Sequence, residues 1–82
     1  MPTVFRTRNG WRVVIYPNDH RPPHVHVVDG DRSARFELLC ALGEVALMST
    51  IGFSQSEVSR VATELQAKIG LLCNAWEEVR GD

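Results

Sequence analysis

The sequence has few cysteines, no long apolar run and almost no net charge, and each of these absences excludes a class of protein. No apolar segment approaches the roughly 20 residues that cross a bilayer, so we expect no membrane partner. The N-terminal segment MPTVFRTRNG lacks the apolar core of a signal peptide. Cys40 and Cys73 are too few for a disulfide framework, and both stand in apolar surroundings. We therefore expect free, buried thiols and a cytoplasmic protein.

The formal net charge of −1 hides an uneven distribution of charge along the chain. In residues 1–35, six arginines against three aspartates give +3, and in residues 36–82 three basic against seven acidic residues give −4. Such an asymmetry is typical of a phosphate-facing half or of a surface that meets an oppositely charged partner. A total near zero argues against strong non-specific binding to DNA, which usually requires a clearly basic domain.

The length of 82 residues allows one hydrophobic core, so we expect a single domain over residues 1–82. The first half has the pattern of short strands, in the segments PTVFRTR, WRVVIYP, HVHVV and RSARFELLC, with ALGEVALMS as a fifth. Asn9-Gly10 and the sequence around Gly30 are hairpin-turn signals, and NDHRPP has the composition of a loop. These signals predict a small antiparallel sheet of four to five strands.

The last third of the chain predicts one long helix. Ser54 and Glu57 have the spacing of a capping box, and Gly81 is suited to ending the helix. Apolar residues recur between them at three- and four-residue spacing: Val58, Val61, Ala62, Leu65, Ile69, Leu72, Cys73 and Trp76. Gly70 is a weak position in this pattern. Because one helix cannot bury its apolar stripe alone, we expect an α+β fold in which the sheet packs against this C-terminal helix.

All three histidines fall within the segment YPNDHRPPHVHVV, at His20, His24 and His26. Side chains alternate across a strand, so Val25 and Val27 share one face while His24 and His26 share the other. If the valines lie beneath the helix, the two imidazoles point away from it, toward solvent or a partner. The same face is expected to carry Arg12, Tyr16, Ser33, Arg35 and Glu37.

This face has the groups that metal-independent cleavage of RNA requires. The reaction needs a base for the 2′-hydroxyl, an acid for the leaving oxygen and a cation for the phosphate. We therefore predict that His24, His26 and Arg35 are catalytic. The residues predicted to bind substrate around them are Arg12, Tyr16, His20 and Arg21.

Two other interpretations of the histidines stay open. A metal ion would use His24 and His26, with His20, Asp19 or Glu37 as a third ligand. That ligand count is minimal, so we expect no metal and no cofactor. Alternatively, the histidines are ordinary polar residues of a strand. Histidine in a short strand does not by itself indicate a catalytic or metal-binding function.

From MPTVF through YPNDHRPPHVHV to NAWEE, the sequence resembles domain-of-unknown-function family 4160, a family of short bacterial proteins. The most specific part is PPHVHV, which covers Pro23, His24, Val25, His26 and Val27. Members are often encoded beside another small protein, in an arrangement similar to a type II toxin–antitoxin pair. The resemblance implies a compact cytoplasmic protein, the toxin-like member, with a small cognate partner encoded nearby. It supplies no established reaction.

Two hypotheses about function follow. In the first, the protein is a toxin-type component that acts on RNA or on the translation apparatus through His24, His26 and Arg35. In the second, it is a non-enzymatic protein-binding module, an antitoxin or a partner-binding subunit, whose exposed sheet face meets a partner. A homodimer is compatible with both hypotheses.

Overall fold

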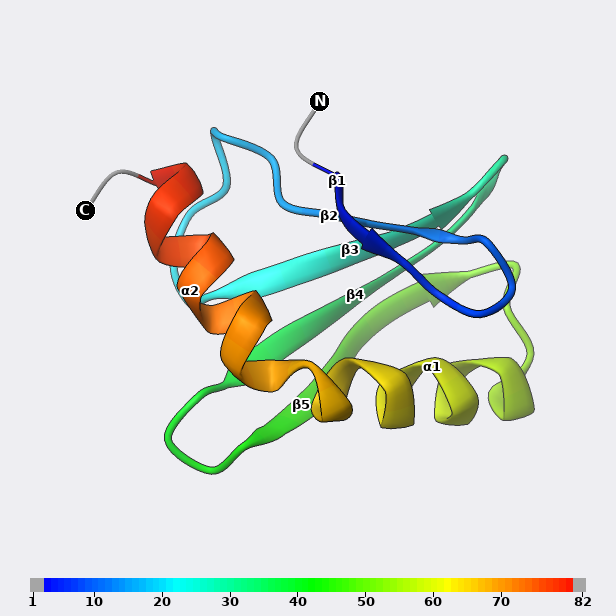
Figure 1. Cartoon of the computed structure of the whole chain (residues 1–82). Coiled ribbons are helices and arrows are strands. Elements are labelled where there is room, and N and C mark those ends of the chain that lie inside the picture. Colours follow the sequence, from blue (N-terminus) through cyan, green and yellow to red (C-terminus); the bar gives the residue numbers. More distant parts are fainter. Residues whose placement is uncertain (1–2, 81–82) are drawn as a thin grey trace.

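The computed structural model describes residues 3–80, which form one antiparallel sheet followed by two helices (Figure 1). The elements are β1 (Thr3–Arg6), β2 (Arg12–Val14), β3 (His24–Asp29), β4 (Arg32–Leu39), β5 (Glu44–Ile51), α1 (Gln55–Ala67) and α2 (Ile69–Arg80). The strands are neighbours in chain order, from β1 at one edge to β5 at the other. The α+β class and the small antiparallel sheet are therefore confirmed. Neither described helix is long and apolar enough to span a membrane.

The central strand β3 alternates between its two faces as predicted. Val25 and Val27 are fully buried, and both pair with buried residues of β4. The pairing of the two strands ends at Asp29 and Arg32, so Gly30 and Asp31 form a two-residue turn between them. Gly30 has a φ of 61°, a left-handed conformation that such a hairpin turn requires.

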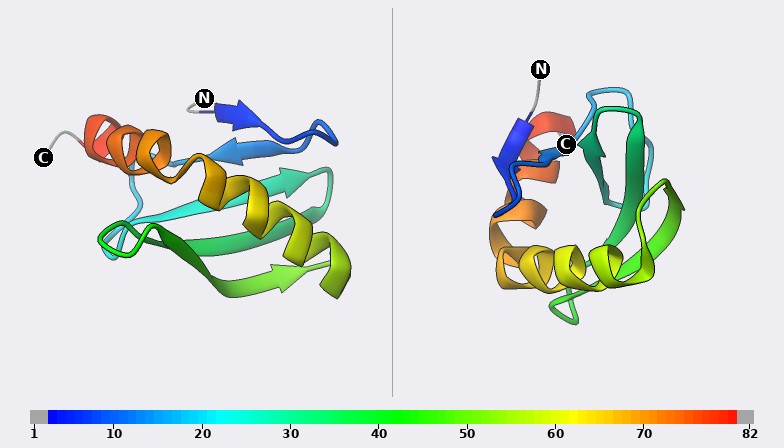
Figure 2. Two further views of the ribbon diagram at one scale, coloured as in Figure 1. Left: turned by 60° about the horizontal axis from the view of Figure 1, so that its bottom comes forward. Right: turned by 90° about the vertical axis from the view of Figure 1, so that its right-hand side faces the viewer.

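A break at Lys68 divides the C-terminal region into two helices, so the prediction of one long helix is wrong. The Lys68 N–H donates to the Leu65 carbonyl at 3.0 Å, which closes α1 with a tightened last turn. Both helices lie on one face of the sheet, with α1 along β5 and α2 turned toward β4 (Figure 2). Gly70 favours a break here because its helix propensity is low. The apolar spacing continues from Leu65 to Leu72 across the break, so the pattern did not reveal it.

The beginning of α1 matches its sequence signal. Ser54 Oγ accepts the Glu57 N–H at 3.2 Å, and a Glu57 carboxylate oxygen accepts the Ser54 N–H at 2.8 Å, which confirms the capping box. Glu57 also accepts from Arg32 Nη1 at 3.1 Å. The Ser54 N–H is the main cause that lowers the pKa of the Glu57 carboxyl, and Arg32 contributes. These contacts join the first turn of α1 to the start of β4.

The core lies between the sheet and the two helices. Its buried members are Trp11, Val13, Ile15, Val25, Val27, Ala34, Phe36, Leu38, Val61, Leu65, Leu72 and Trp76. Trp76 is the largest fully buried side chain, and its ring centroid lies 5.4 Å from that of His24. The core therefore reaches from α2 to the first residue of β3, where the histidine segment begins.

Cys40 and Cys73 form a disulfide, so the prediction of free thiols is wrong. Cys40 directly follows β4 and Cys73 lies in α2, at a sequence separation of 33 residues. The packing of α2 against β4 brings the Cα atoms of Cys40 and Cys73 to 6.2 Å from each other. This separation suits a disulfide, and it arises only when the chain folds. The argument from free thiols to a reducing compartment therefore loses its basis.

Reduction of the disulfide should destabilise the fold. A bridge that closes a loop of this size typically contributes about 2–4 kcal/mol, so urea unfolding with reductant should show a lower free energy of unfolding. A Cys40→Ser/Cys73→Ser variant is the control, because its unfolding should not respond to reductant. If thiol titration of unreduced, denatured protein finds both cysteines reactive, the disulfide is contradicted.

Truncation of the buried Trp76 should also destabilise the fold. Trp76→Ala removes a fully buried ring, a change that typically costs about 3–5 kcal/mol. Leu71→Ala is the matched control on the same helix, because Leu71 is 48% exposed and its removal should change stability by about 0.5 kcal/mol or less. Equal thermal midpoints of the two variants would contradict the central position of Trp76 in the core.

Candidate functional site

The segment between β2 and β3 folds back onto the face of β3 that carries His26. The Asp19 N–H donates to the Tyr16 carbonyl at 3.0 Å, and Asp19 Oδ2 accepts the Tyr16 N–H at 3.1 Å. At the other end of the segment, the Pro23 carbonyl accepts the Leu38 N–H of β4 at 2.8 Å. Asn18 and Asp19 are turn-forming residues, and their short polar side chains suit this compact geometry. The segment thereby places the Asp19 carboxylate beside the two histidines of β3.

His24 is buried, with only 7% of its surface exposed, between this segment and α2. Its Nδ1 lies 2.8 Å from the Pro22 carbonyl oxygen. A carbonyl can only accept, so Nδ1 carries the hydrogen and donates it. The prediction that both imidazoles point away from the helices is wrong for His24. The reason is that α2 packs across the end of β3, where Trp76 meets the His24 ring.

His26 is half-buried, and its Nε2 lies 3.2 Å from Asp19 Oδ2. The Tyr16 ring approaches the imidazole edge-on, with centroids 4.8 Å apart. Burial is the largest influence on His26 and lowers its pKa below the usual value, although the Asp19 carboxylate acts in the opposite direction. Burial thus favours the neutral imidazole. Arg35 of β4 is the register partner of His26 and lowers this pKa further.

A shallow pocket of about 310 Å³ opens beside His24. Its lining residues are Asn18, Asp19, His20, Arg21, Pro22, His24, Arg35 and Met48. Arg35 Nε donates to Ser49 Oγ of β5 at 3.1 Å, which ties the guanidinium to the β5 side of the pocket. Arg21 forms an exposed ion pair with Glu77 of α2 at 3.6 Å. The pocket therefore combines cationic side chains with one buried imidazole.

The structure brings together most, but not all, of the residues predicted from the sequence. The predicted residues that line the pocket are His20, Arg21, His24 and Arg35. His26 joins them through Asp19, and Tyr16 joins through its ring contact with His26. Arg12 pairs with Val28 of β3, which lies farther along the strand, and it is outside the described lining of the pocket.

Asp19 is the residue whose importance the sequence did not reveal. It was only one of three alternatives for a third metal ligand, yet its carboxylate contacts both His24 and His26. The local signal was a turn-forming Asn18-Asp19 pair. That signal predicts a turn, but the position of the turn over β3 depends on how the whole segment folds.

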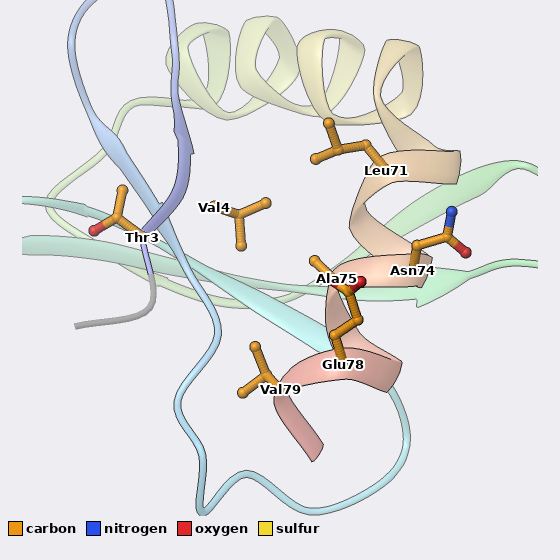
Figure 3. A pocket seen from close by; sticks show the side chains of 7 residues that line it. All are labelled: Thr3, Val4, Leu71, Asn74, Ala75, Glu78 and Val79. Atoms are coloured by element: carbon orange, nitrogen blue, oxygen red, sulfur yellow. The ribbon is translucent and has the colours of Figure 1, made fainter. Parts of the chain in front are cut away.

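A second hollow, of about 530 Å³, lies between β1 and α2 (Figure 3). Its walls include the apolar side chains of Val4, Leu71, Ala75 and Val79, and Glu78 is its one titratable residue among those described. It lacks the group of polar and cationic side chains that gathers near His24. The His24 pocket is therefore the better candidate for chemistry.

Residues 10–77 match the family described as Domain of unknown function (DUF4160). The match covers β2 to β5, α1 and most of α2, and it includes Asp19, His24, His26 and Arg35. No curated protein and no solved structure matches the chain significantly.

The enclosure of His24 leads to a stability prediction. His24→Ala removes the ring that packs on Trp76, and with it the donor to the Pro22 carbonyl. The free energy of unfolding should therefore fall by about 1–3 kcal/mol. His20→Ala is the control in the same loop, and because His20 is exposed its effect should stay within about 0.5 kcal/mol. Urea unfolding measures both, and indistinguishable midpoints would contradict a structural contribution of His24.

Proposed function

The chain belongs to domain-of-unknown-function family 4160, and we propose that it is the toxin-type component of a bacterial type II toxin–antitoxin pair that acts on RNA. The observation that carries this proposal is the His24 pocket, in which His20, Arg21 and Arg35 surround a buried imidazole. Guanidinium groups bind phosphate oxygens through paired N–H donors. A phosphodiester is therefore the ligand whose charge and shape suit these side chains.

The size and charge of the site favour local recognition of RNA. A pocket of about 310 Å³ accommodates one phosphodiester with part of a flanking nucleotide. The net charge of −1 is unsuited to a broad electrostatic groove, which would need many cationic contacts along the backbone. A single-stranded or unpaired region of RNA is the substrate that fits, since its backbone can enter a small pocket.

In the proposed reaction, the 2′-hydroxyl of the RNA attacks the adjacent phosphorus and gives its proton to an imidazole, and the bond to the 5′-oxygen breaks as that oxygen takes up a proton. Arg35 stabilises the negative charge that develops on the phosphate. The imidazoles of His24 and His26 both turn Nε2 toward Asp19, so the three residues act as one fixed unit. This unit would orient the attacking oxygen at the edge of the pocket. Groups that are already held in position need no reorganisation during the reaction, which favours catalysis. A target in RNA or the ribosome also implies a cytoplasmic location.

A protein-binding role is the second candidate, and the exposed surface of β5 favours it. Leu47, Met48 and Ile51 of this strand are exposed, and within residues 3–80 the strand has a neighbour on one side only. An apolar edge strand can accept a strand from another protein. Because Met48 also lines the His24 pocket, a cognate partner on β5 would lie at the rim of the pocket.

Expression in a bacterium without the neighbouring gene separates the two roles. The wild-type chain should arrest growth and produce new RNA ends, whereas Arg35→Gln should cut RNA about 10²–10³-fold more slowly and restore growth. Arg60→Gln is the control, because Arg60 is exposed on α1 and lies outside the His24 pocket, so this variant should arrest growth as the wild type does.

Harmless expression of the wild-type chain would contradict the toxin-type role. Stable co-purification with the product of the adjacent gene would then favour the protein-binding module. A Leu47→Lys variant should weaken that complex, since it places a charge on the exposed face of β5.

A further inference from the structure

We propose that Asp19, His24 and His26 form a binding site for a divalent transition-metal ion of the zinc type. The three residues each present one ligand atom, and these atoms lie within 4.8 Å of one another. Two imidazoles and one carboxylate suit Zn²⁺ or Co²⁺ better than Ca²⁺ or Mg²⁺, which prefer oxygen ligands alone. This site goes beyond the proposed action on RNA and does not depend on it.

The distances from Asp19 Oδ2 to the two imidazole nitrogens are close to those around a tetrahedral ion. Bonds of about 2.0–2.1 Å around a tetrahedral zinc place neighbouring ligand atoms about 3.4 Å apart. Asp19 Oδ2 lies 3.2 Å from His26 Nε2 and 3.6 Å from His24 Nε2. All three ligand atoms lie within 4.8 Å of one another, so binding of an ion would draw the two imidazole nitrogens closer together while Asp19 Oδ2 stays near its present distance from each.

The hydrogen bonding of His24 points to a cation at the same place. The Pro22 carbonyl takes the hydrogen on Nδ1, so in the neutral ring Nε2 bears a lone pair. That lone pair faces the Asp19 carboxylate at 3.6 Å in a largely buried position. Two acceptors so placed repel each other unless a cation or an additional proton lies between them. A backbone carbonyl on the second ring nitrogen is the usual support of a metal-bound histidine.

Asp19 is also held in position before any ion binds. Its Oδ2 accepts the Tyr16 N–H at 3.1 Å, so the carboxylate is fixed toward the histidines by the backbone. His26 lies on a strand, which fixes its backbone. When its Nε2 binds an ion, the hydrogen of the neutral ring moves to Nδ1, and the ion takes the place of the present hydrogen bond to Asp19. Such preorganisation keeps the cost of assembling the ligands low.

The three protein ligands would leave one tetrahedral position open. His24 and Asp19 both line the pocket described above, so a water molecule or substrate oxygen can reach that position. Three protein ligands with one open position are typical of catalytic zinc sites, whereas structural sites use four. From the sequence we expected no metal because the ligand count was minimal, and the position of Asp19 changes that assessment.

Metal titration of the untagged full chain, stripped with chelator, tests the site. Co²⁺ should bind with a stoichiometry of one ion per chain and give visible absorption bands, which Zn²⁺ should abolish by displacement. Asp19→Asn and His26→Ala should each weaken binding by at least about tenfold. Asp19→Asn keeps an oxygen that can accept the Tyr16 N–H, so circular dichroism and thermal melting should show that it stays folded.

His20→Ala is the matched control, because His20 lies in the same loop but outside the three-residue cluster. It should bind Co²⁺ as tightly as the wild-type chain. The metal site is overturned if the wild-type chain binds no Co²⁺ or Zn²⁺. It is equally overturned if Asp19→Asn and His26→Ala bind as the wild type does, or if His20→Ala weakens binding as much as His26→Ala. An active protein that binds no ion would leave the action on RNA intact, so the two proposals fail independently.

Discussion

The carboxylate of Asp19 holds the segment between β2 and β3 against the sheet, and the shape of the candidate site depends on it. Its Oδ2 accepts the Tyr16 N–H at 3.1 Å and lies within 3.6 Å of Nε2 of both His24 and His26. One oxygen thereby joins the beginning of the loop to two positions on β3. Residues 18–22 form much of the pocket wall, so this contact helps to hold the wall in place, together with the hydrogen bond from the Leu38 N–H to the Pro23 carbonyl.

The site is also joined to the core, through the contact of the His24 and Trp76 rings. The His24 ring lies between the loop and Trp76, so it belongs both to the pocket and to the packing of α2. A change at Trp76 would therefore disturb the site without being part of its chemistry. His26 makes its contact with Asp19 on the face of β3 opposite Val25, and it is a better position at which to separate function from stability.

Features determined by neighbouring residues could be predicted from the sequence, and features determined by packing could not. The strands, the turn at Gly30, the capping box at Ser54 and the burial of Val25 follow from local conformation and alternation. The break at Lys68 could not be predicted, because the apolar spacing runs through it. The disulfide, the burial of His24 and the position of Asp19 arise where α2 and the loop meet the sheet. Each needs two segments that are distant in sequence.

In the folded chain, the oppositely charged halves form ion pairs with each other. The sequence suggested a phosphate-facing half or a charged partner, but side chains of the positive residues 1–35 also meet side chains of the negative residues 36–82. Arg21 pairs with Glu77, and Arg32 pairs with Glu57. Arg35 differs, because in the described part of the chain its guanidinium bonds to Ser49 and makes no ion pair with a carboxylate. A guanidinium that no carboxylate among residues 3–80 pairs with, beside a buried histidine, keeps its attraction for an anion, and this makes Arg35 the strongest candidate to hold a phosphate.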